Sequence, residues 1–271
     1  MSVRRPAVAG LFYSPDRDGL LKELDSSFLH PLGPGRLPEA VGPFTGSLLG
    51  IVSPHAGYMY SGPVAAHGYL ALSRSGRPDV VFIMGPNHQG IGSPLALSEA
   101  EEWETPLGTV EVDREVSRLL MGACDLLAPD EHAHRYEHSV EVQVPFLQRV
   151  FEAFSIVPIV MLLQNCEVAE SLGRAMARVI EENGLRAYIV ASTDFTHYEP
   201  DDVAKRKDRL AIDKITALDH RGLYDAVVET PISMCGPGPV MTLIVAAREL
   251  GATRVTPVSY THLTLPTTER V

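Results

Sequence analysis

The sequence predicts one α/β domain in which a central, mostly parallel β-sheet is flanked by helices. Short apolar runs alternate along the chain with stretches of helical length, which is the pattern of strands connected by helices. Residues 80–84 are apolar at every position, as expected for a strand that is buried on both faces. The chain has 271 residues, of which 45% are hydrophobic and 21% charged, so it is long and apolar enough to bury a core.

Each predicted element follows from a local pattern. The Pro- and Gly-rich stretch 31–45 is expected to be a surface loop. Asp113 is an N-cap for the helix that follows it, and Asn183-Gly184 and Gly251 can end the two helices before them. Strands are expected at 48–52, 80–84, 94–98, 109–112, 156–162, 187–191 and 253–258, and helices at 18–29, 63–72, 113–121, 139–151, 167–182, 201–218, 223–228 and 239–250.

The predicted domain covers residues 1–257, and the remaining segment 258–271 has an unusual sequence. Residues 258–267 can be encoded by GTC TCT TAT ACA CAT CTG ACG CTG CCG ACG, which resembles a common transposase adapter. We therefore expect 258–271 to be a non-native tail, produced when the gene was read into adapter sequence. His262 belongs to this tail and is left out of the functional argument.

Composition excludes several classes of protein. The net charge is 23 − 34 = −11, which argues against non-specific nucleic-acid binding. The three cysteines are far apart, which excludes a disulfide framework and a cysteine-rich zinc module. No stretch approaches the ~20 uninterrupted apolar residues of a membrane helix, and the N-terminus lacks the pattern of a signal peptide. We expect a cytoplasmic protein.

Polar side chains follow three of the predicted strands, at the point where each strand ends. His55 and His88 each come shortly after a strand, and Asp194 and His197 follow a third. Because ligands of open α/β sheets bind outside the carboxyl ends of the strands, these side chains are expected to share one site. A hydrogen-bonded structural role is the alternative for any single histidine.

Cys235 lies in Met234-Cys235-Gly236-Pro237, just before an apolar helix. A helix N-terminus lowers the pKa of a thiol, and the resulting thiolate is both a nucleophile and a metal ligand. A small structural residue at a tight turn is the alternative. Two histidines with a cysteine or carboxylate form a ligand set that suits iron, copper or zinc.

Glu137 and Glu141 are four residues apart. Glu137 lies just before the helix predicted at 139–151, and Glu141 lies in its first turn. Acidic side chains are favourable at a helix N-terminus, so both are expected to stabilise its first turn. The chain contains no Gly-x-Gly-x-x-Gly turn before a helix, no P-loop, no Gly-x-Ser-x-Gly elbow and no His-Glu-x-x-His motif.

Taken together, the motifs resemble the MEMO family, which is the B component of the AmmeMemoRadiSam system in prokaryotes. The matching stretches are Arg5-Pro6-Ala7-Val8-Ala9-Gly10-Leu11-Phe12-Tyr13, Pro54-His55-Ala56-Gly57-Tyr58, Gly85-Pro86-Asn87-His88, Glu137-His138-Ser139-Val140-Glu141, Ser192-Thr193-Asp194-Phe195-Thr196-His197-Tyr198 and Cys235-Gly236. The resemblance implies an α/β fold related to the class III extradiol dioxygenases, which use non-haem iron. It also implies partners, namely a radical SAM protein and an AMMECR-type protein of the same system.

The resemblance also assigns roles to individual residues. It implies that His55, His88 and Cys235 bind a metal, with iron expected first and copper or zinc as alternatives. Asp194 and His197 match further polar residues of the same pocket and are expected to be catalytic. A cysteine at the position where dioxygenases have a carboxylate is a departure from dioxygenase chemistry.

Three functions therefore remain open at this point. The first is a metal-dependent redox enzyme, dioxygenase-like in its fold. The second is a non-enzymatic binding or adaptor module whose pocket binds a peptide or a small molecule. The third is a cysteine-dependent hydrolase in which His55, His88 or His197 activates Cys235.

Overall fold

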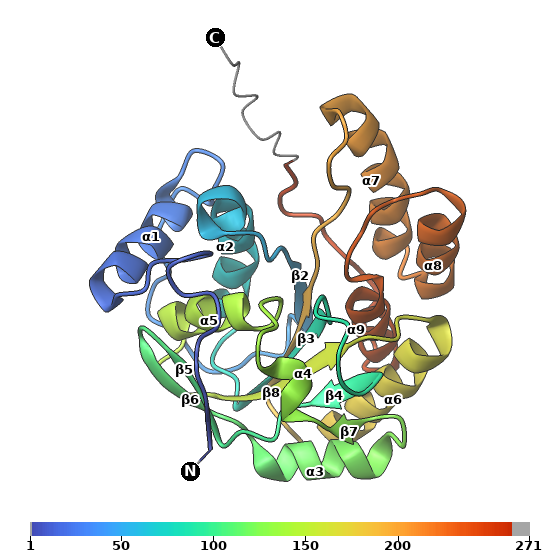
Figure 1. Ribbon diagram of the computed structural model, residues 1–271, viewed down its shortest axis with the longest axis horizontal. Helices are drawn as coiled ribbons and strands as arrows, with labels where there is room; N and C mark the ends of the chain where they lie inside the picture. The colour runs from blue at the N-terminus through green and yellow to red at the C-terminus, as the bar shows by residue number, and fades with distance from the viewer. Residues whose placement is uncertain (1, 262–271) are drawn as a thin grey trace.

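The computed structural model describes residues 2–261 (Figure 1). The strands are β1 Val3–Arg4, β2 Gly50–Ser53, β3 Val80–Pro86, β4 Leu95–Leu97, β5 Glu102–Thr105, β6 Gly108–Glu111, β7 Ala128–Pro129, β8 Ser155–Met161 and β9 Ala187–Ser192. The helices are α1 Arg17–Leu29, α2 Tyr58–Arg74, α3 Arg114–Ala123, α4 Glu131–His134, the 3₁₀ turn Glu141–Gln143, α5 Val144–Val150, α6 Cys166–Glu182, α7 Asp201–Thr216, α8 His220–Glu229 and α9 Pro237–Glu249.

The main sheet has six strands in the order β2-β9-β3-β8-β4-β7. Its first four strands are parallel to one another, and β4 pairs antiparallel with β8. Strands β1, β5 and β6 form a separate small sheet. The single α/β domain with a mostly parallel sheet that the sequence predicts is therefore confirmed.

Helices cover both faces of the main sheet and bury a core on each (Figure 1). Strand β3 contributes to both cores through its alternating side chains. Val81 and Ile83 pack on the face covered by α1, α2 and α5, whereas Phe82 and Met84 pack on the face covered by α6 and α9. An apolar residue is thus required at every position of β3, which explains the continuous apolar run.

Register brings the carboxyl ends of the parallel strands to one edge. Ser53, the last residue of β2, pairs with Ser192, the last residue of β9. Pro86, the last residue of β3, pairs with Met161 of β8. The loops that follow β2, β3 and β9 therefore begin at the same edge of the sheet.

Most of the predicted elements are present, and two predictions are wrong. Residues 253–258 are coil and not a strand, and Pro257 lacks the N–H group that a strand ladder needs. The helix expected at 139–151 is shorter: only a 3₁₀ turn and α5 form, because the chain before them is held by long-range contacts described below.

Of the segment 258–271, the structure describes 258–261 as coil, and 262–271, with His262, lie outside the described residues. Among the described residues, no helix is both long and apolar enough to cross a lipid bilayer.

Candidate metal centre

Three side chains from distant parts of the chain meet at the carboxyl edge of the sheet. His55 follows β2, His88 follows β3, and Cys235 directly precedes the cap of α9. One donor atom from each lies within 4.8 Å of the others. His55 is buried, whereas the His88 side chain is 31% exposed, so the cluster is open to solvent on one side.

The buried contacts of His55 fix the position of its proton. Its Nδ1 lies 2.8 Å from the Ser192 hydroxyl, which lies 2.6 Å from the carbonyl oxygen of Ser139. Because a carbonyl only accepts, the hydroxyl donates its single hydrogen there and accepts from His55 Nδ1–H. Nε2 lies 3.2 Å from the Cys235 sulfur, and it carries the lone pair that could bind a metal whenever the ring is neutral.

A buried carboxylate positions His88 in the same way. Glu137 Oε1 lies 2.9 Å from His88 Nδ1, and Oε2 accepts the His88 backbone N–H at 2.6 Å. Since a carboxylate only accepts, Nδ1 carries a hydrogen, and Nε2 is the nitrogen through which the ring can bind a metal once it has released its own proton. Burial opposes the charged ring, but hydrogen bonds to Cys235 and Glu137 outweigh it and raise the pKa of His88 to about 10.

Cys235 is held in its ionised form by its neighbours. Burial disfavours the thiolate, yet the charge and hydrogen bond of His55 and the hydrogen bond of His88 lower the pKa of Cys235 to about 6. The Asp194 backbone N–H also donates to the sulfur at 3.1 Å. Gly236 permits this close approach, because a Cβ there would lie 2.6 Å from the Ser192 carbonyl oxygen.

Sequence reasoning missed His138, which faces both site histidines. Its ring stacks on His88 at a centroid distance of 4.5 Å and lies edge-on to His55 at 5.3 Å. Burial and the charge of His55 lower the pKa of His138 to about 4. The only available signal was its position beside Glu137, which was interpreted as part of a helix start.

Glu137 and Glu141 do not serve as the simple helix-capping pair that was expected. Glu137 accepts hydrogen bonds from the backbone N–H groups of His138 and Ser139 as well as from His88. Glu141 is buried against the N-terminal segment and pairs there with Arg4. Contacts across the fold, rather than the helix dipole, therefore determine where both side chains lie.

The structure places Asp194 beside the cluster and His197 farther along the same loop. Asp194 Oδ1 accepts the His55 backbone N–H at 2.9 Å, and Oδ2 lies 3.8 Å from His55 Nε2. His197 Nδ1 lies 2.8 Å from the Ser233 carbonyl oxygen. Both residues line a cavity of about 550 Å³ that adjoins the cluster.

Comparisons with known proteins identify the family of this chain. The family model described as "Memo-like protein" matches residues 4–271. The chain belongs to the Memo family. It is 50% identical to a MEMO1 family protein of Pyrobaculum aerophilum, covering 94% of this chain and 90% of the relative. It is 49% identical to MEMO1 family proteins of Methanothermobacter thermautotrophicus and Methanopyrus kandleri, covering 93% and 92% of this chain and 90% and 88% of the relatives.

The donor set of this Memo-family site suits a transition metal. Two imidazole nitrogens and one thiolate are ligands of iron, copper and zinc, and three protein ligands leave coordination positions open. A second group, His88, Glu137 and His138, also has donors within 4.8 Å of one another. Its carboxylate already accepts hydrogen bonds from a ring and three backbone N–H groups, so it is better suited to orienting the histidines.

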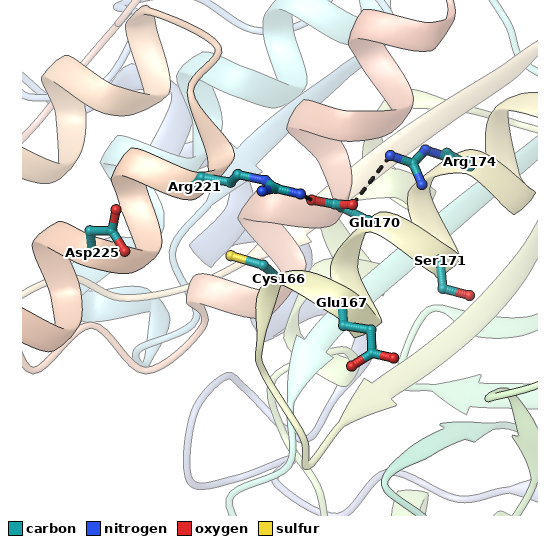
Figure 2. Close-up of a pocket in the computed structure, with 7 residues that line it drawn as sticks. All are labelled: Cys166, Glu167, Glu170, Ser171, Arg174, Arg221 and Asp225. Atoms are coloured by element: carbon teal, nitrogen blue, oxygen red, sulfur yellow. Dashed lines mark hydrogen bonds and ion pairs between the residues drawn. The ribbon is translucent and has the colours of Figure 1, made fainter.

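Another cavity of this Memo-family chain, of about 720 Å³, is lined by residues of α6 and α8. Figure 2 shows Glu170 reaching toward Arg174 and Arg221. The carboxylate lies 2.7 Å from Arg221 and 2.9 Å from His220 Nε2. Because these charges are paired with one another, we consider this cavity a poorer candidate for chemistry than the histidine–cysteine cluster.

Proposed function

We propose that this Memo-family protein binds a redox metal through His55, His88 and Cys235 and carries out metal-dependent redox chemistry. The observation that supports the proposal is the direction of the three donors. Both imidazoles have Nδ1 engaged by acceptors on the protein and Nε2 directed at the Cys235 sulfur, and the pKa of that thiol is lowered to about 6. Hydrogen bonds at the outer nitrogen are the usual way in which proteins orient metal-binding histidines.

Iron is the first candidate metal, following the resemblance to dioxygenases, and copper or zinc would also accept this ligand set. A redox metal at this position would supply electron transfer to a substrate coordinated beside it. The thiolate adds negative charge where the related dioxygenases use a carboxylate. We therefore propose dioxygenase-like architecture without assigning dioxygenase activity.

We assign the adjoining acid–base roles to Asp194 and His197. Asp194 faces the cavity and can accept a proton from a bound substrate, while its other oxygen holds the His55 backbone. The Ser233 carbonyl fixes the hydrogen of His197 on Nδ1, so Nε2 of the neutral ring can accept a proton from a ligand in the cavity. Neither residue is needed to hold the metal.

Metal analysis of anaerobically purified protein tests this proposal. After reconstitution with Fe(II), Cu or Zn, we expect about one metal per chain, because the site is formed by the fold. Asp194→Asn and His197→Ala should bind the same amount. Fewer than about 0.1 metal per chain would contradict a metal site and favour the binding-module alternative. Retention of zinc alone would contradict the redox role, and metal loss in either variant would make that residue a ligand.

The 3.2 Å contact between Cys235 Sγ and His55 Nε2 supports a second candidate, a cysteine-dependent hydrolase. A thiolate beside an imidazolium can attack an acyl carbon, and the imidazolium can then donate its proton to the leaving group. A thiol-reactive acyl probe distinguishes the candidates. Labelling of Cys235 that is lost in His55→Ala but unchanged by chelator would favour the hydrolase over the metal site.

The proposed redox reaction also involves partners. Following the family resemblance, we propose that the protein acts with a radical SAM protein and an AMMECR-type protein. Co-purification from the native organism tests this. Absence of both proteins from the recovered complex, and of their genes from the genome neighbourhood, would contradict it.

We also propose that 258–271 is a non-native tail. The point affects the assays because Ser259, Tyr260 and Thr261 line the cavity. Resequencing the locus from intact DNA tests it, since recovery of the same tail would contradict an adapter origin. The metal experiments should therefore be repeated in a chain with its resequenced C-terminus.

A further inference from the structure

The cavity beside the cluster lies between the ends of β2 and β9, helix α2 and helix α7. Its lining includes Val52, Tyr60, Asp194, Phe195 and Asp208. Its volume of about 550 Å³ is within the usual range for a small-molecule site. Asp194 contacts both the cavity and His55, so a ligand held in the cavity would lie next to the proposed metal centre.

Asp208 places a buried carboxylate in the cavity wall. The residue is 1% exposed, and its oxygens accept hydrogen bonds from the Thr196 backbone N–H at 3.0 Å and from the Tyr260 hydroxyl at 2.5 Å. Within residues 2–261, the structure shows no ion pair between Asp208 and a cationic side chain. Because a buried charge is costly unless it is compensated, this carboxylate favours a positive charge nearby.

The rest of the described lining has the same electrostatic character. It contains the carboxylates of Asp194, Asp208 and Glu199 and no lysine or arginine. Glu199 is paired with Lys207 at 2.5 Å and does not contribute to the argument. Asp194 and Asp208 therefore provide two carboxylates in the wall of one cavity whose lining has no lysine or arginine, and Asp194 also faces His55 Nε2 at 3.8 Å.

Aromatic side chains provide the second, independent observation. Tyr60, Phe195 and Tyr198 line the cavity, and Tyr60 is 42% exposed. Tyr198 is 94% exposed and has a φ of 59°, a conformation that is unfavourable for a residue of this type. Aromatic faces attract cations through the ring quadrupole, so rings and carboxylates select the same class of ligand.

Thr196 adds an unused hydrogen-bonding group. It lines the cavity, and its buried hydroxyl has no hydrogen-bond partner within the described part of the chain. Buried hydroxyls are normally satisfied, so an unsatisfied one at a cavity wall is consistent with a partner that belongs to a ligand.

We propose that this cavity binds a small organic cation, an alkyl- or arylalkyl-ammonium, as the substrate of the adjacent centre. This inference depends on the proposed function, because it names the substrate of the same site. The ammonium lies between the carboxylates of Asp194 and Asp208, and its apolar part packs on Tyr60 and Phe195. The segment 258–271 contributes the hydrogen bond from Tyr260 and, through Ser259, Tyr260 and Thr261, part of the cavity lining.

Calorimetric titration with matched probes tests the proposal on the full chain, once after chelator treatment and once after metal loading. Benzylammonium should bind in both states at least about tenfold more tightly than benzyl alcohol, and benzoate should bind least. N-acetyl-lysine methylamide distinguishes a lysine side chain from a free amine as the source of the cation. The tighter of the two cations identifies that source, and either result supports the proposal.

Variants assign the binding to this cavity. Tyr60→Leu should weaken benzylammonium binding about 2- to 30-fold, whereas Tyr60→Phe, which keeps the ring, should bind like the parent. Asp208→Asn should weaken it at least about tenfold, and Asp225→Asn in α8 is the matched control outside the cavity. Circular dichroism of each variant confirms that it is folded.

Two results would overturn the proposal. The first is binding of benzyl alcohol or benzoate that equals binding of benzylammonium. The second is a folded Tyr60→Leu variant with parent affinity. The chelator-treated protein is titrated separately, so a failure to bind the cation in that sample can be told apart from a failure to bind metal. Metal stoichiometry in the same samples reports on the proposed function independently.

Discussion

The variants His55→Ala, His88→Ala and Cys235→Ser should each abolish the thermal stabilisation that metal gives the parent chain. The three residues are far apart in sequence, so the site exists only in the folded protein and metal binding stabilises that state. At a metal concentration one hundred times the dissociation constant, the stabilisation is about 2.7 kcal/mol. For a domain of this size, that corresponds to a rise in Tm of roughly 5–10 °C. Differential scanning calorimetry with and without metal measures it.

The other two cysteines are matched controls. Cys124 is buried near Ser171, and the Cys166 sulfur lies 4.0 Å from that of Met241, so neither belongs to the cluster. Cys124→Ser and Cys166→Ser should keep the full rise in Tm. If any of the site variants keeps a residual rise in Tm, it should be Cys235→Ser, because a hydroxyl is a poorer but usable ligand. If Cys235→Ser is stabilised as much as the parent, the thiol does not bind metal and the hydrolase becomes the better hypothesis.

Replacing Arg4 by Met should lower the free energy of unfolding by about 3–5 kcal/mol, because it leaves a buried carboxylate without its cation. The Arg4 guanidinium pairs with Glu141 and donates to the carbonyl oxygens of His134 and Glu137. Both partners of the ion pair are buried, with side-chain exposures of 3% and 1%. The contact therefore joins the N-terminal segment to the loop that carries Glu137 and His138.

Urea denaturation measures this effect, and Arg5→Met at an exposed neighbouring position is the control. The double variant Arg4→Met/Glu141→Leu should recover part of the loss by removing the unpaired charge. Recovery should be incomplete, because Glu141 also accepts hydrogen bonds from Tyr13 and from the backbone N–H of Ala7. A loss below about 1 kcal/mol for Arg4→Met would show that the pair behaves like an exposed ion pair.

The parts of the site that lie on strand ends were predictable from sequence. An apolar run such as β3 indicates a strand buried on both faces, and parallel strands bring their carboxyl ends to one edge. His55, His88, Asp194 and His197 were therefore expected to share one site. Cys235 was a candidate because of its position before a helix, and its assignment as a metal ligand came from the family resemblance.

The loop around Glu137 could not be predicted from its own residues. Two glutamates four apart are equally compatible with a helix start and with buried long-range contacts. The outcome was decided by residues far away in sequence, since His88 bonds to Glu137 and Arg4 to Glu141. His138 was missed for the same reason: only the folded loop brings its ring against His88 and His55.

The central claim, that His55, His88 and Cys235 bind one metal with the thiolate as a ligand, is tested most directly by the absorption spectrum of the Co(II)-loaded protein. Thiolate ligation of Co(II) produces a sulfur-to-metal charge-transfer band in the near ultraviolet. We predict this band in the parent and in Cys124→Ser, at about one cobalt per chain, and its loss in Cys235→Ser. A cobalt-loaded parent without the band, or a Cys235→Ser variant that keeps it, would contradict the account.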